Sequence, residues 1–221
     1  MKKVVIVGAK GSGKDILATI LRCNEKSKIF KVLGFIDDDP NLKHKEILGK
    51  KVLGGLNWFD NNKDKIFCVV AIGDSFIRKK IIRELESKNV NFLTLIDPSV
   101  IFSKDVKIGV GSIIQAGSII NPDTIIGKHV FINLDSTIGH DCILEDFVTI
   151  STGVHINGTC IVKEGAYVST GVVTLPNTKI GKWSVVGAGS IVINELKSNS
   201  VYIGNPAKIS RKISSKNRPK L

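Results

Sequence analysis

Residues 108–156, IGVGSIIQAGSIINPDTIIGKHVFINLDSTIGHDCILEDFVTISTGVHI, carry an aliphatic side chain at every sixth position. The same period continues without an insertion to Val192, and only Thr174 is not aliphatic. No amphipathic helix has this period, because one face of a helix recurs every 3.6 residues. A short fixed period is typical of a solenoid whose units stack on one another. The second half of the chain is therefore predicted to be all-β, with one short strand and one corner in each unit.

Three units complete one coil of a triangular prism. We expect the aliphatic residue to point inward and stack on its equivalents in the neighbouring coils. A mostly small residue stands two positions before it, and we expect that residue to lie where the corner tightens. Glycine or asparagine often follows the aliphatic residue, as at Gly109, Gly139 and Asn157. We attribute this preference to corner φ values that other residues disfavour.

The first third of the chain has the pattern of a small α/β unit with a parallel sheet. An apolar run at residues 2–7 leads into GAKGSGKD and then into an apolar-periodic stretch from Ile16 to Leu21. This order predicts a strand, a glycine-rich turn and a helix, as in Rossmann-like domains. The other elements are expected as strands at residues 32–36, 66–72 and 92–96 and a helix at 75–88.

We place the domain boundary near Asp97-Pro98. Residues 1–97 are then a Rossmann-like domain, 98–207 a parallel β-helix, and 208–221 a basic C-terminal tail.

Two nucleotide-binding motifs compete for GAKGSGKD. A Walker A loop would need a Ser or Thr hydroxyl for Mg²⁺ where Asp15 stands, and no convincing Walker B strand follows. The dinucleotide fingerprint G-x-G-x-x-G is not reproduced either. Both motifs share glycine amides and a helix N-terminus that can receive a phosphate, and that property remains here. A purely structural tight turn is the alternative.

The composition limits the partners. The net charge is +12, but part of it lies in a terminal run that reads as a solvated tail, namely Lys208, Arg211, Lys212, Lys216, Arg218 and Lys220. With 6% aromatic residues and no recognition motif, we expect no nucleic-acid partner. No apolar run approaches the roughly 20 residues of a membrane span, and no cleavage site follows the N-terminus, so a cytoplasmic protein is expected.

The four cysteines and four histidines are the candidate nucleophiles, bases and metal ligands of the chain. Four cysteines stand at wide spacings that fit neither a zinc site nor a disulfide framework, so they are expected to be small buried side chains and no metal is expected. His140 follows an inward position at a corner and should project outward, beside Asp141. His44 and His129 are interpreted as solvated surface residues, whereas His155 could be either structural or functional.

The two halves together resemble a known family. VIVGAKGSGKDI, FIDDD and VVAIGD, joined to hexapeptide units such as TIGHDC and to a final YIGNPAK, closely resemble the nucleotide-sugar N-acetyltransferases that modify UDP-4-amino sugars, and their sialic-acid O-acetyltransferase relatives. The resemblance covers essentially the whole chain. It implies that residues 1–97 bind the nucleotide sugar and that residues 98–207 are a left-handed β-helix acyltransferase domain. It also implies acetyl-CoA as cosubstrate and a homotrimer with active sites between neighbouring subunits.

The resemblance also implies roles for individual residues. A histidine followed by an acidic residue, in a segment like NLDSTIGHDCILEDF, supplies the general base and its helper, which are here His140 and Asp141. Glu145 or Asp146 could replace Asp141 as the partner of the base. Matched positions also give substrate contacts at Lys10, Gly11, Ser12, Asp37, Asp38, Gly73 and Asn133. Coenzyme A contacts fall at Thr149, Thr170 and Ala188, and Lys208 and Arg211 could meet its 3′-phosphate.

The leading hypothesis is acetyl-CoA-dependent N-acetylation of a nucleotide-linked 4-amino sugar in bacterial glycan biosynthesis, by direct transfer with His140 as base. Cys142 could form a covalent intermediate, but its inward position disfavours that route. The alternatives are O-acetylation of a sugar such as sialic acid, a silent scaffold or nucleotide-sugar sensor, and a nucleotidyltransferase with an appended β-helix. The last is disfavoured because the N-terminal domain is too short.

Overall fold

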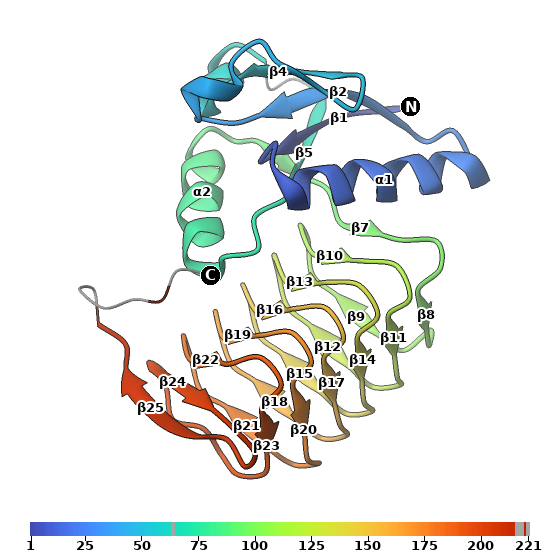
Figure 1. The fold of residues 1–221 in the computed structure, drawn as a ribbon. Coiled ribbons are helices and arrows are strands. Elements are labelled where there is room, and N and C mark those ends of the chain that lie inside the picture. Colours follow the sequence, from blue (N-terminus) through green and yellow to red (C-terminus); the bar gives the residue numbers. More distant parts are fainter. Residues whose placement is uncertain (63–64, 215–218, 220–221) are drawn as a thin grey trace. The chain divides into compact units, whose positions relative to one another are not determined.

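The structure is a computed structural model that describes residues 1–62, 65–214 and 219. Three basic residues of the predicted tail, Lys216, Arg218 and Lys220, lie outside these ranges. The chain divides into two compact units, of which the first contains residues 1–73 and 77–98 and the second residues 74–76 and 99–221. Figure 1 shows the α/β unit with its helices and the stacked coils of the second unit.

The N-terminal unit is built on a six-stranded sheet with the order β3-β4-β2-β1-β5-β6. The strands of this sheet are β1 (Lys2–Val7), β2 (Phe30–Ile36), β3 (Glu46–Ile47), β4 (Lys50–Gly54), β5 (Ile66–Val70) and β6 (Asn91–Phe92). A seventh short strand, β7 (Leu95–Ile96), follows and is not part of this sheet. Its helices are α1 (Gly11–Lys26), η1 (Pro40–Leu42), η2 (Leu56–Asp60) and α2 (Ser75–Ser87). All pairs of this sheet are parallel except β3 with β4.

The expected strand–turn–helix order is confirmed, and its sequence explains it. Val4, Val5 and Ile6 of β1 are 0% exposed, because a central parallel strand is covered on both faces. Ile16 and Ile20 on α1 are also fully buried. The antiparallel β3–β4 pair at the sheet edge was not predicted, and the strand expected at residues 92–96 is divided into β6 and β7.

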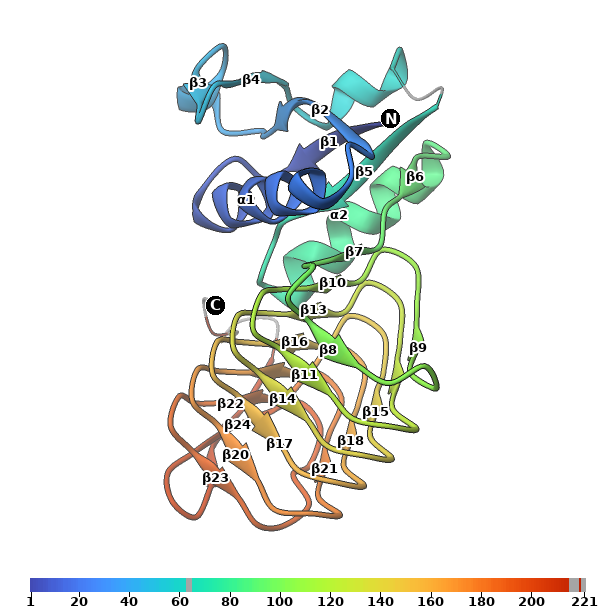
Figure 2. The same ribbon diagram turned by 90° about the vertical axis from the view of Figure 1, so that its right-hand side faces the viewer.

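The second unit is a three-sided prism of parallel two-residue strands (Figure 2). The β10 sheet contains β10 (Ile113–Ile114), β13 (Phe131–Ile132), β16 (Thr149–Ile150), β19 (Tyr167–Val168), β22 (Val185–Val186), β24 (Ser200–Ile203) and β25 (Lys208–Lys212). The β11 sheet contains β8 (Ile101–Phe102), β11 (Ile119–Ile120), β14 (Thr137–Ile138), β17 (His155–Ile156), β20 (Val173–Thr174) and β23 (Ile191–Val192). The β12 sheet contains β9 (Lys107–Ile108), β12 (Ile125–Ile126), β15 (Ile143–Leu144), β18 (Ile161–Val162) and β21 (Lys179–Ile180).

Turns between these sheets form the three corners of the prism. The Asn133 corner joins the β10 sheet to the β11 sheet, the His140 corner joins the β11 sheet to the β12 sheet, and the Trp183 corner joins the β12 sheet to the β10 sheet. Residues eighteen apart pair in register, as Ile132 does with Ile150. Each corner is therefore a column of turns, one from every coil.

The inward positions confirm the six-residue period. From Ile114 to Val192 every residue of the series is at most 2% exposed. Thr174, the polar member, is also 0% exposed, and its hydroxyl oxygen accepts a hydrogen bond from the Asn157 amide at 3.0 Å. This bond satisfies a group that would otherwise destabilise the core. The small residues two positions earlier, such as Ser112 and Ser136, are buried as well.

The explanation proposed for the corner glycines is wrong in one respect. The left-handed φ values fall three residues after the inward position, as at Asp141 (56°) and Gly153 (65°), and not directly after it. Gly139 has no such φ, but a Cβ added there would lie 2.5 Å from the Gly158 amide nitrogen of the next coil. The residue after the aliphatic position is thus small because two coils approach closely there.

The prediction that His129 is a solvated surface residue is also wrong. Its side chain is 3% exposed and stacks on Phe147 of the next coil, with ring centroids 5.5 Å apart. Both residues occupy the left-handed position of the Trp183 corner, as does Trp183. A bulky residue with this φ is uncommon. Packing of the rings within the column compensates for the strain. His44 is exposed, as expected.

The last strands close the C-terminal end of the prism. β25 pairs antiparallel with β24, so the first residues of the predicted basic tail form a strand whose side chains are all exposed. The Asn205-Pro206 peptide bond in the connection is cis. Among the described residues, no helix is long and apolar enough to cross a membrane.

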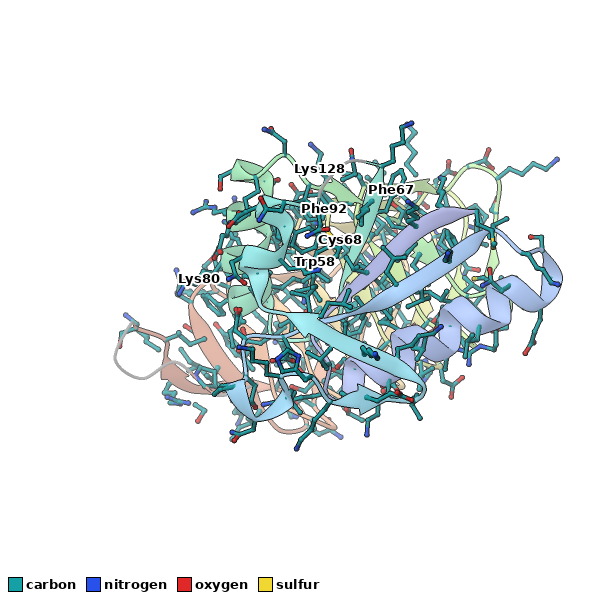
Figure 3. The ribbon with its side chains drawn as sticks, turned by 90° about the horizontal axis from the view of Figure 1, so that it is seen from above. Trp58, Phe67, Cys68, Lys80, Phe92 and Lys128 are labelled. Carbon is teal, nitrogen blue, oxygen red and sulfur yellow. The ribbon has the colours of Figure 1, made fainter. Side chains whose placement is uncertain are left out.

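The four cysteines are free thiols. Cys68, Cys142 and Cys160 are buried, as expected, and Cys23 is half-buried. Figure 3 labels Cys68 on β5, which pairs in register with Phe92 of β6.

Candidate functional site

His140 projects from the His140 corner, in the turn between β14 and β15. Its side chain is 64% exposed, and its Nδ1 lies 2.7 Å from Oδ2 of Asp141. An ionised carboxylate can only accept, so Nδ1–H donates this bond and the neutral ring carries its lone pair on Nε2. A neutral ring with a lone pair on Nε2 is the form of histidine that acts as a general base.

Backbone bonds to the adjacent coils fix both residues of this pair. The Asp141 amide donates to the Pro122 carbonyl at 3.1 Å, and the Thr159 amide donates to the His140 carbonyl at 2.8 Å. Asp141 has the left-handed φ of the corner, which aspartate adopts more readily than most residues. The corner geometry therefore brings the carboxylate beside the imidazole.

Glu145 and Asp146, the alternative partners, lie at the Trp183 corner and bind backbone amides. Glu145 Oε2 accepts from the Glu164 amide at 2.9 Å, and Asp146 Oδ1 accepts from the Lys128 amide at 2.7 Å. The His140 ring instead forms its hydrogen bond with the Asp141 carboxylate.

Cys142 lies in the same turn as His140 but points into the prism. It is 0% exposed, and its Sγ donates to the Asn157 carbonyl at 3.2 Å. Its hydrogen bond with Cys160 and its burial raise the pKa of the thiol. A protonated, buried thiol is a poor nucleophile.

The remaining prism residues implied by the resemblance lie elsewhere. Asn133, Thr170 and Ala188 are all in the Asn133 corner, where the Gly189 amide donates to the Thr170 carbonyl at 2.9 Å. Asn133 Oδ1 accepts from the amide of Leu134. Thr149 is on β16 and is 2% exposed. A single chain therefore places Asn133, Thr170 and Ala188 at one corner and His140 at another, with the β11 sheet between them.

In the N-terminal unit, Asp37 ties the glycine-rich turn to the end of β2. Its two oxygens accept from the Ala9 amide at 2.8 Å and the Asp39 amide at 2.9 Å. Asp38 Oδ1 accepts from the Leu56 amide at 3.0 Å. These bonds hold the carboxyl ends of β1 and β2 together, which is where open α/β sheets bind ligands.

Two pockets share Asp37 and Asp38. The smaller, of about 190 Å³, is lined mainly by apolar residues together with Gly8. The larger, of about 520 Å³, adds polar groups and the Trp58 ring. Sequence reasoning did not find Trp58, because the short η2 helix that carries it has no periodic or motif signal.

The other predicted substrate residues of this unit are more dispersed. Lys10 forms an ion pair with Asp39 at 3.0 Å, and their hydrogen bond raises the pKa of Lys10 and lowers that of Asp39. Lys10 and Gly11 line a third pocket of about 490 Å³ together with Lys14. Ser12 is half-buried in the first turn of α1, and Gly73 follows β5, where its carbonyl accepts from Arg78 Nη1 at 2.9 Å.

Within the described part of the chain, no group of three or more His, Cys, Asp or Glu residues is arranged to hold a metal ion.

Comparisons with known proteins agree on one family. The profile described as PglD N-terminal domain matches residues 3–85. A curated relative, UDP-N-acetylbacillosamine N-acetyltransferase of Bacillus subtilis, is 34% identical over an alignment of 127 positions. That alignment covers 52% of this chain and 52% of the relative, so the chain matches about half of its length.

Solved structures match over nearly the full length. Perosamine N-acetyltransferase PerB of Caulobacter crescentus, in complex with CoA and GDP-perosamine, is 30% identical, with 94% of this chain and 97% of that chain covered and a TM-score of 0.87. The same enzyme has also been solved with one histidine replaced by asparagine or alanine. The acetyltransferase domain of PglB from Neisseria gonorrhoeae, in complex with acetyl coenzyme A, is 25% identical over 94% of this chain and 98% of that chain, with a TM-score of 0.86.

Proposed function

Because this chain belongs to the PglD-like, left-handed β-helix family of nucleotide-sugar N-acetyltransferases, we propose that it transfers an acetyl group from acetyl-CoA to the amino group of a nucleotide-linked sugar. The observation that carries this proposal is the His140–Asp141 pair on the prism corner, in which the His140 side chain is 64% exposed. Structures of the related enzymes contain CoA or acetyl-CoA, and the PerB complex also contains a nucleotide-linked amino sugar.

The chemistry follows from the hydrogen bond between the two side chains. His140 Nε2 removes the proton from the substrate nitrogen as that nitrogen attacks the acetyl carbonyl carbon. Asp141 holds the ring through Nδ1 and stabilises the positive charge that the ring acquires. Acetyl-CoA supplies the activated acetyl thioester, and the thiol is released in the same direct transfer. The burial of Cys142 supports transfer without a covalent acyl-enzyme.

We propose a homotrimer with active sites between subunits, because the proposed functional residues of one prism lie at two different corners. His140 is at one corner of the prism, whereas Asn133, Thr170 and Ala188 are at another. A second prism placed against the β11 sheet would bring the Asn133 corner of one subunit toward the His140 corner of its neighbour. Thr170 and Ala188 are exposed on successive coils, which suits backbone binding of an extended coenzyme A.

In the N-terminal unit, the pockets around Asp37 and Asp38 are proposed to hold the nucleotide of the sugar substrate. Amide groups of the glycine-rich turn and the N-terminus of α1 favour a diphosphate. Lys14 adds a positive charge beside Gly11.

The proposal is tested by following thiol release from acetyl-CoA with a panel of acceptors. UDP- and GDP-linked 4-amino sugars, the matching 4-hydroxy sugars and free sialic acid would be compared at equal concentrations. We expect turnover with a nucleotide-linked amine and none with the matching hydroxy sugar. Turnover with sialic acid alone would establish O-acetylation in its place, and no thiol release with any acceptor would support a non-catalytic scaffold.

A further inference from the structure

The His140 ring packs against a glycine of the next coil, Gly158. An ideal Cβ built on Gly158 would lie 2.6 Å from His140 Nε2, 2.8 Å from Cε1 and 3.1 Å from Cδ2. These three ring atoms are the nearest heavy atoms to that Cβ. Real Cβ atoms essentially never approach other atoms closer than 3.0 Å. The imidazole therefore occupies the space that any side chain at residue 158 would need.

The backbone does not explain why residue 158 is a glycine. Gly158 lies outside the left-handed φ region, so alanine could adopt its conformation without strain. Its position in the turn recurs every sixth residue from Val110 to Ala188, and Gly158 is the one member of that series without a side chain. It is also the member that lies one coil, eighteen residues, beyond His140.

The contact differs in kind from those of Gly109 and Gly139. Gly111 and Gly165 also face side chains, of His129 and Trp183, but their left-handed φ values by themselves favour glycine. A Cβ on Gly139 or Gly109 would meet the backbone of the next coil, which cannot move without distorting the prism. A Cβ on Gly158 would meet a side chain that can rotate away. Rotation would break the 2.7 Å bond between Nδ1 and Asp141 and would redirect Nε2.

We propose that Gly158 is a positioning residue for acetyl transfer, which holds the His140 imidazole in its Asp141-bonded orientation by leaving room for the ring. This inference rests on the proposed role of His140 as base. It predicts that a methyl group at residue 158 impairs the base and leaves the fold intact.

The test is the Gly158→Ala variant, with Pro176→Ala as the matched control in the same corner one coil further on. We expect Gly158→Ala to lower kcat about 100-fold, because a misplacement of about 1 Å has effects of that size. The KM for acetyl-CoA should stay unchanged, and the thermal midpoint should stay equal or rise. Pro176→Ala should keep the wild-type kcat.

A double-mutant cycle separates positioning from a merely structural role. In single-turnover assays, adding Gly158→Ala to His140→Ala should cause no further loss, because Gly158 acts only through the ring. An equal loss in both backgrounds, a wild-type kcat for Gly158→Ala, or a lowered thermal midpoint would each overturn the inference. If His140→Ala itself kept full activity, the proposed function of the base would fail instead.

Discussion

Each corner of the prism places different demands on its residues. The residue directly after the inward position touches the next coil, and the residue two places later takes a left-handed φ. At the His140 corner these two places are held by Gly139 and Asp141. The residue between them is free of both constraints, so a histidine can stand there and point outward. The proposed catalytic pair thus stands in an ordinary turn of the prism.

Cys142, two residues after His140, gives a prediction at the residue scale. The pKa of the Cys142 thiol is raised above the usual value for cysteine, so the thiol stays protonated at neutral pH. It ionises only at a more alkaline pH than an ordinary cysteine. We expect Cys142→Ala to keep the wild-type kcat at pH 7 to 8, measured by thiol release. A loss of several orders of magnitude, with an acetylated cysteine trapped in the wild-type protein, would show a covalent route.

At the scale of elements, stability of the prism comes from short strands whose two residues have opposite environments. In β12, Ile126 is 2% exposed and Ile125 is 43% exposed. The inward residue packs on Ile108 and Leu144 of the adjacent coils through the register of β9 and β15. Burial of this column, repeated in every coil, offsets the small number of hydrogen bonds that each two-residue strand can make.

This arrangement predicts a matched pair of effects. Ile126→Ala should lower the free energy of unfolding by about 2–5 kcal/mol, because it leaves a cavity in the stack. Ile125→Ala, its neighbour on the same strand, should have a much smaller effect. Urea denaturation followed by circular dichroism measures both, and equal losses would contradict the inward assignment.

The inward column was predictable because its signal is periodic and local. The corners were predicted less well, since their chemistry depends on residues eighteen positions away. His129 alone looks like a surface histidine, and it is buried only because Gly111 and Phe147 lie beside it in the adjacent coils. The contact between the His140 ring and Gly158 also joins residues of adjacent coils. A comparison of residues eighteen apart would have found both.

At the scale of the whole molecule, we propose that the two units supply different parts of one reaction. The N-terminal unit has pockets at the carboxyl ends of parallel strands, and the prism carries the proposed base. The motifs at Asp37 and Asp38 were visible in the sequence. The position of Trp58 in a pocket wall was not visible, because the short η2 helix that carries it has no periodic sequence signal.

The most direct measurement of the central claim is the activity of His140→Ala with acetyl-CoA and the nucleotide-linked amine that the wild-type protein uses. Without the base, kcat should fall by about 10²–10⁴-fold. The affinity for acetyl-CoA, measured by calorimetry on the same sample, should be unchanged. A variant that binds acetyl-CoA normally and still turns over at the wild-type rate would contradict the assignment of His140.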